Sequence, residues 1–369
     1  MAVVGMSTSA TCGVRDYAIG LADALGGENV SCSMHWLDRR EQALAATRAE
    51  VNSWAGGLAA ELERLQPDAV LLHYSVFSLA YRGLPLFVSP TLAALRRRAP
   101  LLTVMHEFAY PWGRAGLRGT AWAVSQRGVL IEVMRASAAA LVTIDARADW
   151  LGSRVWLPRR PVAFAPVFSN LPPPSAGAPA DPRPARLGLF GYSHEGSAVA
   201  LVLDALSLLR DRGRTVELTL LGAPGRDSPV GQAWLEGART RALGPVLSFS
   251  GHLGAQQLSN ALAACELLLF ADSAGPSSRK TTLAASLASG SAVVAIDGPL
   301  RWSELTDAQA VQLVAPSAHA LADGLGALLG DERRRDALAE RGRAFAERQM
   351  SVARSARAVA ALLQRTLTG

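Results

Sequence analysis

The most constraining feature of this sequence is an alternation of short apolar runs with amphipathic stretches, which occurs twice along the chain. Short apolar runs are typical of buried strands in a parallel sheet, and the amphipathic stretches between them are typical of helices that cover the sheet. Residues 166–186, rich in proline, alanine, glycine and serine, interrupt the alternation near the middle of the chain. Because proline removes backbone donors and ends helices, this segment predicts a linker. The chain is therefore predicted to be an α/β protein with two Rossmann-like, doubly wound domains.

The expected order of domains and strands follows from this alternation. An N-terminal domain covers residues 1–168, the linker 169–186 and a C-terminal domain 187–350, and a helical segment covers 351–369. The expected strands are residues 2–6, 69–72, 101–105, 140–143 and 162–165 of the first half, and 187–190, 217–221, 246–250, 267–270, 292–295 and 311–314 of the second. Parallel sheets bind ligands outside the carboxyl ends of their strands, so two such domains would face each other across a two-substrate cleft.

Composition excludes several classes of protein. Hydrophobic residues make up 50% of the chain, yet no apolar run approaches the ~18–20 residues that a membrane span needs. The start, MAVVGMSTSA, lacks the basic region and long apolar core of a secretory signal, so we expect a cytoplasmic protein. Neither the three cysteines nor the six histidines have ligand spacing. We therefore expect neither a disulfide framework nor a metal site held by the protein.

The net charge of +6 is carried almost entirely by arginine, and Lys280 is the only lysine. One interpretation is a solvated basic surface. The other is attraction of phosphorylated ligands or of an anionic membrane surface. No basic patch interleaved with aromatic residues accompanies the charge, so nucleic acid is not an expected partner.

The first candidate motif follows the first expected strand, in residues 8–25 (TSATCGVRDYAIGLADAL). Gly13 opens the turn, and Asp16 can cap the helix that follows. Free N–H groups at a helix N-terminus attract anions, which makes this turn a candidate phosphate site. The alternative is an ordinary turn between a strand and a helix.

The second motif is HEFAYPW, which follows the expected strand at 101–105. His106 and Glu107 stand at the end of that strand, where a rigid element positions them within reach of a ligand. Histidine titrates near neutral pH and can donate, accept or transfer a proton. Alternatively, the two side chains form a hydrogen-bonded pair that only orders the loop.

The third motif lies in residues 267–299, where a strand runs into a loop of glycine, proline and serine. Arg279 and Lys280 end this loop, and Thr281 and Thr282 open the next helix. Hydroxyls, helix N–H groups and two cations thus gather at one point that is suited to an anion. The alternative is a basic, capped helix start on the surface.

The fourth motif is GYSHEG, which begins at Gly191 after the first strand of the second half. It lacks a full GxGxxG pattern, so a dinucleotide site is weakly supported. Gly222 and the sequence SGHLG at 250–254 follow the next two strands. Because all three turns lie at the ends of successive strands, they are expected to form one nucleotide-facing rim.

Taken in order, these motifs resemble a known family. The sequences CGVRDYA, HEF, SNLP, SGHLG and GPSSRKTTLAASLASGSAVVA are similar to segments of the bacterial group 1 glycosyltransferases, which are retaining, metal-independent enzymes of the GT-B fold. The resemblance covers essentially the whole chain. It implies transfer of a sugar from a nucleotide-diphosphate sugar (a UDP-, GDP- or dTDP-sugar) to a hydroxyl of a sugar, a lipid-linked intermediate or a natural product. It further implies that the co-substrate is the only cofactor, that weak peripheral membrane contact is possible and that the last helix returns to the N-terminal domain.

The resemblance also implies roles for individual residues. His106 corresponds to the histidine that faces the donor sugar and is the expected catalytic residue. The implied acceptor-binding residues are Arg15, Tyr17, Tyr74 and Glu107. The implied donor-binding residues are Gly13, Gly191, Ser193, Gly222, His252, Leu253, Ser278, Arg279, Lys280, Thr281 and Thr282.

The sequence departs from the family at three points. Ser277 and Ala285 occupy the sites of the family's paired glutamates. The usual Arg and Lys are missing from the sequence GYSHEG, and the pair Arg279 and Lys280 resembles a substitute found in a divergent branch. These departures leave open a non-catalytic binding or partner protein on the same fold. Another enzyme, such as an epimerase or a phosphorylase, is a further alternative, although the setting of Lys280 does not suit the pyridoxal phosphate of a phosphorylase.

Overall fold

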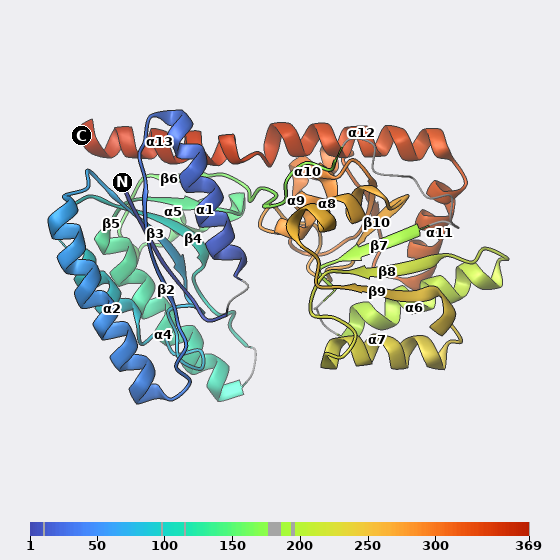
Figure 1. The fold of residues 1–369 in the computed structure, drawn as a ribbon, viewed down its shortest axis with the longest axis horizontal. Helices are drawn as coiled ribbons and strands as arrows, with labels where there is room; N and C mark the ends of the chain where they lie inside the picture. The colour runs from blue at the N-terminus through green and yellow to red at the C-terminus, as the bar shows by residue number, and fades with distance from the viewer. Residues whose placement is uncertain (10–11, 97–98, 114–115, 176–185, 193–195, 369) are drawn as a thin grey trace. The chain divides into compact units, whose positions relative to one another are not determined.

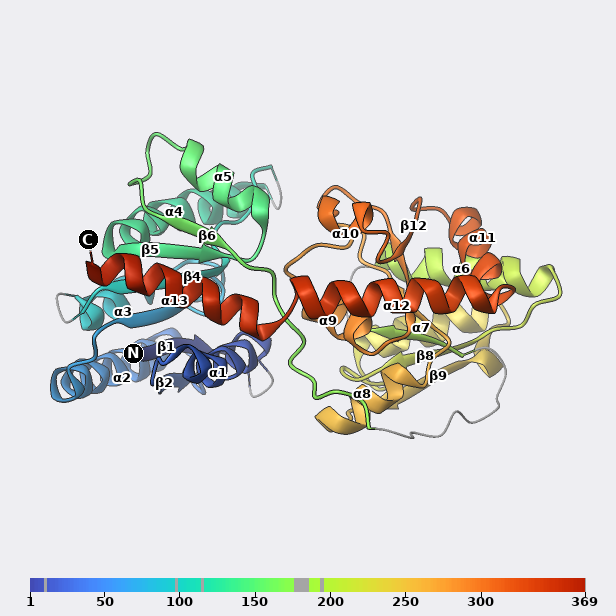
Figure 2. The same ribbon diagram turned by 90° about the horizontal axis from the view of Figure 1, so that it is seen from above.

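The computed structural model of the chain describes residues 1–9, 12–96, 99–113, 116–175, 186–192 and 196–368. These residues form two compact units, each built around a parallel sheet of six strands (Figures 1 and 2). The first unit combines Met1–Val167 with Val352–Gly369, and the second is Phe168–Ser351. Helices cover both faces of each sheet. The predicted α/β class with two Rossmann-like sheets is confirmed.

The sheet of the first unit has the strand order β2-β1-β3-β4-β5-β6. Its central strands are buried along nearly their whole length, as expected for a sheet covered on both faces. The strands are β1 (Ala2–Ser7), β2 (Ser33–Asp38), β3 (Val70–Ser75), β4 (Leu101–Glu107), β5 (Ser137–Val142) and β6 (Val162–Phe164). The helices are α1 (Gly13–Leu25), η1 (Gly26–Glu28), α2 (Leu44–Leu65), α3 (Val88–Leu95), α4 (Gly116–Ala136), α5 (Asp145–Ser153) and α13 (Val352–Thr368).

The sheet of the second unit has the order β12-β11-β10-β7-β8-β9. Its strands are β7 (Arg186–Phe190), β8 (Glu217–Leu221), β9 (Leu247–Gly251), β10 (Leu267–Phe270), β11 (Ala292–Ile296) and β12 (Gln312–Val314). The helices are α6 (Gly196–Asp211), α7 (Pro229–Thr240), η2 (Gly244–Val246), α8 (Ala255–Ala263), α9 (Thr281–Ala288), α10 (Ser303–Asp307), α11 (Ala318–Leu329) and α12 (Glu332–Gln349).

The C-terminal helix α13 belongs to the first unit although it ends the chain. It packs on α1, β5 and β6, and the hydroxyl of its buried Ser355 donates to the carbonyl oxygen of Pro166 at 3.3 Å. Its amphipathic sequence buries Ala356, Val359 and Leu362. The helix thus completes the first hydrophobic core with residues far away in the sequence.

Part of the predicted linker contacts the second unit. The Ser259 hydroxyl of α8 donates to the carbonyl oxygen of Pro172 at 2.6 Å, and the Ser175 N–H donates to Asn260 Oδ1 at 2.8 Å. Residues 176–185 lie outside the described part of the chain. Up to residue 175, the segment therefore runs along α8 and is not a contact-free connection.

Candidate functional site

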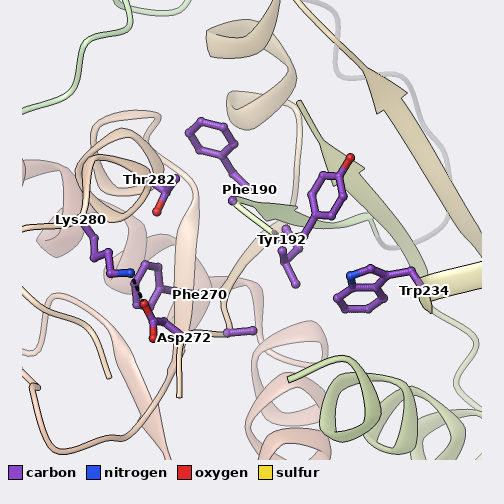
Figure 3. Close-up of a pocket in the computed structure, with 10 residues that line it drawn as sticks. Phe190, Tyr192, Trp234, Phe270, Asp272, Lys280 and Thr282 are labelled. Carbon is purple, nitrogen blue, oxygen red and sulfur yellow. Dashed lines mark ion pairs between the residues drawn. The ribbon is translucent and has the colours of Figure 1, made fainter. Parts of the chain in front are cut away.

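The order of strands in the second unit locates a candidate ligand site. From β7 the chain proceeds to β8 and β9 on one side, and then crosses to β10 on the other, so β7 and β10 flank the point where the strand order reverses. Open parallel sheets bind ligands at this point, outside the carboxyl ends of the strands. A small recess, partly open to solvent, lies there (Figure 3). It is lined by Leu189, Phe190, Gly191, Tyr192, Trp234, Phe270, Ala271, Asp272, Lys280 and Thr282.

Gly191 brings the turn after β7 against the first turn of α9. Its φ of +79° lies in the left-handed region, and a Cβ added there would lie 2.7 Å from Thr282 Cγ2. Only glycine combines that backbone conformation with such a close approach. Since the first N–H groups of a helix have no partner within the helix, the turn faces a helix end that attracts anions.

Lys280 lies at the N-terminal boundary of α9 and reaches into the recess. Its Nζ lies 2.5 Å from Asp272 Oδ2, and the two side chains are 20% and 12% exposed (Figure 3). The only lysine of the chain is therefore held at the recess by a carboxylate that lies two residues after β10. Arg279, just before it, is partly exposed, and Ser278 is buried.

Tyr192 ties together the turns after β7 and β8. Its hydroxyl donates to the carbonyl oxygen of Gly222 at 3.1 Å and accepts from the N–H of Gly225 at 2.6 Å. Burial raises the pKa of Tyr192, and the bond from Gly225 partly offsets the rise. The N–H of Gly222 in turn donates to Ser250 Oγ at 2.9 Å, which connects the end of β9. These bonds hold the predicted rim as one hydrogen-bonded edge.

Of the predicted donor residues that the structure describes, several do not line the recess. His252 is exposed and Leu253 half-buried in the loop between β9 and α8, and neither lines the recess. Gly13 is the exposed first residue of α1, where a Cβ would meet nothing within 4 Å. Ser193 lies outside the described residues.

In the first unit, His106 at the end of β4 lies beside His73 of β3. Nδ1 of His73 is 3.1 Å from Nε2 of His106, and the two rings stack with centroids 5.4 Å apart. The ring of Tyr17 on α1 lies nearly perpendicular to that of His106, with centroids 5.2 Å apart. This cluster of three rings lies next to the reversal of strand order, which in this sheet falls between β1 and β3.

The environment of the pair keeps both histidines neutral. Burial, and then the charge of Arg147, lower the pKa of His106 to about 3. Part of His106 reaches the surface, but protein atoms surround most of its ring. Burial, and then the neighbouring His106, lower the pKa of His73 well below its usual value. Both imidazoles are therefore uncharged at neutral pH.

Arg147 on α5 orders the end of β4. Its Nη1 donates to the carbonyl oxygen of His106 at 2.6 Å, and its Nη2 lies 3.5 Å from Glu107 Oε2. The predicted acceptor residue Glu107 is thus ion-paired with Arg147. A direct pair between His106 and Glu107, which the sequence left open, is replaced by the pairs His106–His73 and Glu107–Arg147.

Two predicted acceptor residues are inside the protein. Tyr74 is fully buried in the core, so the prediction that it contacts an acceptor is wrong: in a strand covered on both faces, its side chain packs against helices. Tyr17 is 2% exposed, and burial raises its pKa to about 12, partly offset by a hydrogen bond with Ser355. It shapes the histidine cluster and presents almost no surface of its own. Arg15 remains partly exposed, with Nη1 2.6 Å from Asp38 Oδ2.

The sequence analysis did not single out His73, Asp38, Arg147, Tyr192 or Asp272. Asp272 could have been found, because it lies two residues after an expected strand, close to the strand's carboxyl end. His73 could also have been found, because it directly follows the expected strand at 69–72. No local signal pairs Arg147 with His106, since 41 residues separate them.

The described residues offer neither a cluster of metal ligands nor a helix suited to spanning a membrane. They contain no group of three or more His, Cys, Asp or Glu side chains placed to hold a metal ion. Within the same described ranges, no helix is both long and apolar enough to cross a membrane.

Comparisons with known proteins identify the fold. The sequence matches no protein-family model, and no curated protein matches it significantly. Solved structures do match over nearly the whole chain. Sucrose-phosphate synthase from Thermosynechococcus elongatus is 13% identical, with a TM-score of 0.72 over 100% of this chain and 99% of its own. The chain has the GT-B fold.

Two further structures agree with the GT-B assignment. A glycosyltransferase from Rickettsia africae ESF-5 is 12% identical, with a TM-score of 0.72 over 100% of this chain and 99% of its own. HepE from Anabaena, solved in complex with UDP and glucose, is 15% identical, with a TM-score of 0.68 over 99% of this chain and 100% of its own. At such low identity the GT-B likeness concerns the path of the chain and not its ligands.

Proposed function

We propose that this GT-B protein is a glycosyltransferase that moves a sugar from a nucleotide-diphosphate sugar to a hydroxyl acceptor. The observation that carries the proposal is the junction of Gly191 with the first turn of α9, where helix N–H groups and Lys280 converge at the reversal of strand order. A diphosphate is the group that such a junction suits best. The complex of HepE, a protein of the same fold, with UDP and glucose supports this choice.

In this proposal the second unit binds the donor and stabilises the leaving diphosphate. The N–H groups of α9, together with Arg279 and Lys280, face the charge that develops as the glycosidic bond breaks. Lys280 is already paired with Asp272, so the diphosphate would either share Lys280 with that carboxylate or displace the carboxylate from it. Because protein groups supply the positive charge, the proposed reaction needs no metal ion.

The proposed reaction retains the anomeric configuration. The acceptor oxygen bonds to the anomeric carbon on the face that the diphosphate leaves, and the departing phosphate oxygen takes the acceptor's proton. His106 would orient the donor sugar, since a neutral imidazole with a pKa of about 3 is a poor proton acceptor. Arg15 and Glu107, both partly exposed, are the remaining candidates for binding the acceptor.

A lipid-linked acceptor is the finer part of the proposal. Leu117 and Val124 on α4 are 92% and 56% exposed, and Trp112 just before the helix is 56% exposed. Arg127 stacks on the Trp112 ring, with Cζ 4.3 Å from the centroid. No acidic residue occurs from Phe108 to Ile131. Exposed apolar and aromatic side chains beside arginine are suited to weak contact with an anionic lipid surface.

The test of the proposal is binding followed by turnover. Thermal shift with UDP, GDP and dTDP should identify one nucleoside diphosphate that stabilises the protein by ~2.7 kcal/mol at 100 times its Kd. The matching nucleotide sugar should then release that diphosphate in the presence of an acceptor. If no nucleoside diphosphate or nucleotide sugar binds, the proposal is wrong.

A non-catalytic binding protein is the second candidate. Ser277 and Ala285, at the sites where the resembling enzymes have glutamates, are 2% and 4% exposed. Ser277 Oγ has no hydrogen-bond partner within the described part of the chain. Tight binding of a nucleotide sugar without release of its diphosphate, over a range of sugar and lipid acceptors, would favour this candidate.

A further inference from the structure

The buried partner of His106 has one unused nitrogen. His73 is 2% exposed, and its Nδ1 lies 3.1 Å from Nε2 of His106. Its other nitrogen, Nε2, is buried and has no hydrogen-bond partner among the described residues. The indole of Trp36 packs nearby, with its ring centroid 6.1 Å from that of His73, and its N–H donates to Ser7 Oγ at 3.0 Å.

This arrangement decides which nitrogen of His73 carries the hydrogen. A neutral imidazole has one N–H donor and one lone pair. A hydrogen on Nε2 would be a buried donor without an acceptor, which is rarer in proteins than an unsatisfied acceptor. His73 therefore carries its hydrogen on Nδ1 and donates it to Nε2 of His106. Since Nε2 of a neutral His106 then accepts, its own hydrogen lies on Nδ1.

We propose that His73 is a positioning residue that fixes His106 as its Nδ1–H tautomer, so that His106 presents a hydrogen-bond donor to a sugar hydroxyl. The identity of that ligand rests on the proposed transferase function, whereas the tautomer rests on the geometry alone. No described residue hydrogen bonds to Nδ1 of His106, which leaves this donor for a ligand.

The residues described around His106 offer its ring no hydrogen-bond partner other than His73. From α1, Tyr17 presents its ring to the pair, while its hydroxyl hydrogen bonds with Ser355 of α13. From α5, Arg147 contacts the carbonyl oxygen of His106 and the carboxylate of Glu107. In this neighbourhood, His73 is the side chain that hydrogen bonds to the His106 ring.

The test measures the tautomer directly by ¹⁵N NMR on protein labelled only at histidine. The chain has six histidines, and His106→Gln assigns the signals of interest by their loss. We expect His106 to show a protonated Nδ1 and a bare Nε2 throughout pH 6–8. In His73→Leu, the new side chain fills similar space but cannot donate a hydrogen bond. We therefore expect the His106 signal to move toward the Nε2–H form, and the rate of transfer to fall about tenfold at an unchanged melting temperature.

Two controls separate positioning from structure. His73→Asn keeps an amide N–H close to the site of Nδ1, so it should restore the Nδ1–H tautomer and most of the transfer rate. His319→Asn, exposed on α11, should alter neither.

Either of two results would overturn the inference: a protonated Nε2 on His106 in the unsubstituted protein, or an unchanged His106 tautomer in His73→Leu. If His73→Leu does not fold, His73→Asn replaces it as the test, and a protonated Nε2 on His106 in that variant would overturn the inference. An Nδ1–H signal in a protein that transfers no sugar would instead leave the inference standing and remove the proposed function.

Discussion

Replacing Gly191 with alanine should destabilise the second unit strongly, because two separate costs meet at one methyl group. The φ of +79° lies in a region that costs other residues about 1–3 kcal/mol. The new Cβ would also lie 2.7 Å from Thr282 Cγ2 and 3.3 Å from Thr282 Oγ1, well inside the usual contact distance of about 3.5–4.0 Å. Overpacking of this kind typically adds about 1–3 kcal/mol. The expected loss is therefore about 2–6 kcal/mol of unfolding free energy.

The assay is urea denaturation, with Gly13→Ala as the matched control. Gly13 begins α1, has no left-handed φ, and a Cβ there meets nothing within 4 Å. Its alanine variant should match the unsubstituted protein or gain up to about 1 kcal/mol. Adding Thr282→Ser to Gly191→Ala removes Cγ2, the closest of the contacted atoms, so the double variant should recover much of the steric cost and keep the cost of φ. The reasoning is refuted if Gly191→Ala is as stable as Gly13→Ala, or if the double variant recovers nothing.

Four further outcomes are expected. Lys280→Ala should weaken nucleoside-diphosphate binding by ~1.5–3 kcal/mol and leave nucleoside binding unchanged, as calorimetry with both ligands would measure; equal losses would make Lys280 structural. His106→Ala should lower kcat more than donor affinity, and unchanged turnover in a folded variant would exclude a role in catalysis. As the pH drops below ~6.5, the free energy of unfolding should fall by about 1.4 kcal/mol per pH unit for each of His106 and His73. The reason is that both histidines take up protons in the unfolded chain, whereas in the folded protein His106 stays neutral down to about pH 3 and the pKa of His73 is also well below its usual value. Urea titrations at pH 7, 6 and 5 would check this, and His106→Gln should make the dependence on pH less steep. Leu117→Glu should reduce sedimentation with anionic phospholipid vesicles but not the melting temperature, and equal sedimentation of both proteins would exclude membrane contact through α4.

The sequence predicts the fold well where the strands are largely buried. Strands β8 and β10 have the bounds that their apolar runs predict. Strand β2 was missed, because an edge strand with a single fully buried residue has no continuous apolar run. Helix α7 begins with a pattern that can be recognised in the sequence, because Ser228 accepts a hydrogen bond from the Gly231 N–H and Pro229 follows it.

Only part of the candidate site could be predicted from the sequence. Gly191, Lys280 and Thr282 were found because each stands at a strand end or a helix start, and the recess brings them together. Tyr74 was misassigned, because a strand buried on both faces gives no sign of which side chains reach a ligand. The positions of Asp272 and His73 near strand ends were visible in the sequence, but their pairing with Lys280 and His106 was not, because no local pattern encodes contacts between different elements.

The place of α13 has a consequence for how the protein is made. The first unit needs Val359, Leu362 and the other buried residues of this helix, which a ribosome adds only after the whole of the second unit. While the second unit is being synthesised, the apolar surface of α1 and β5 that α13 later covers stays exposed. The half of the protein that is translated first is therefore the half that finishes folding last, and a nascent chain stalled before residue 352 would present that surface to chaperones.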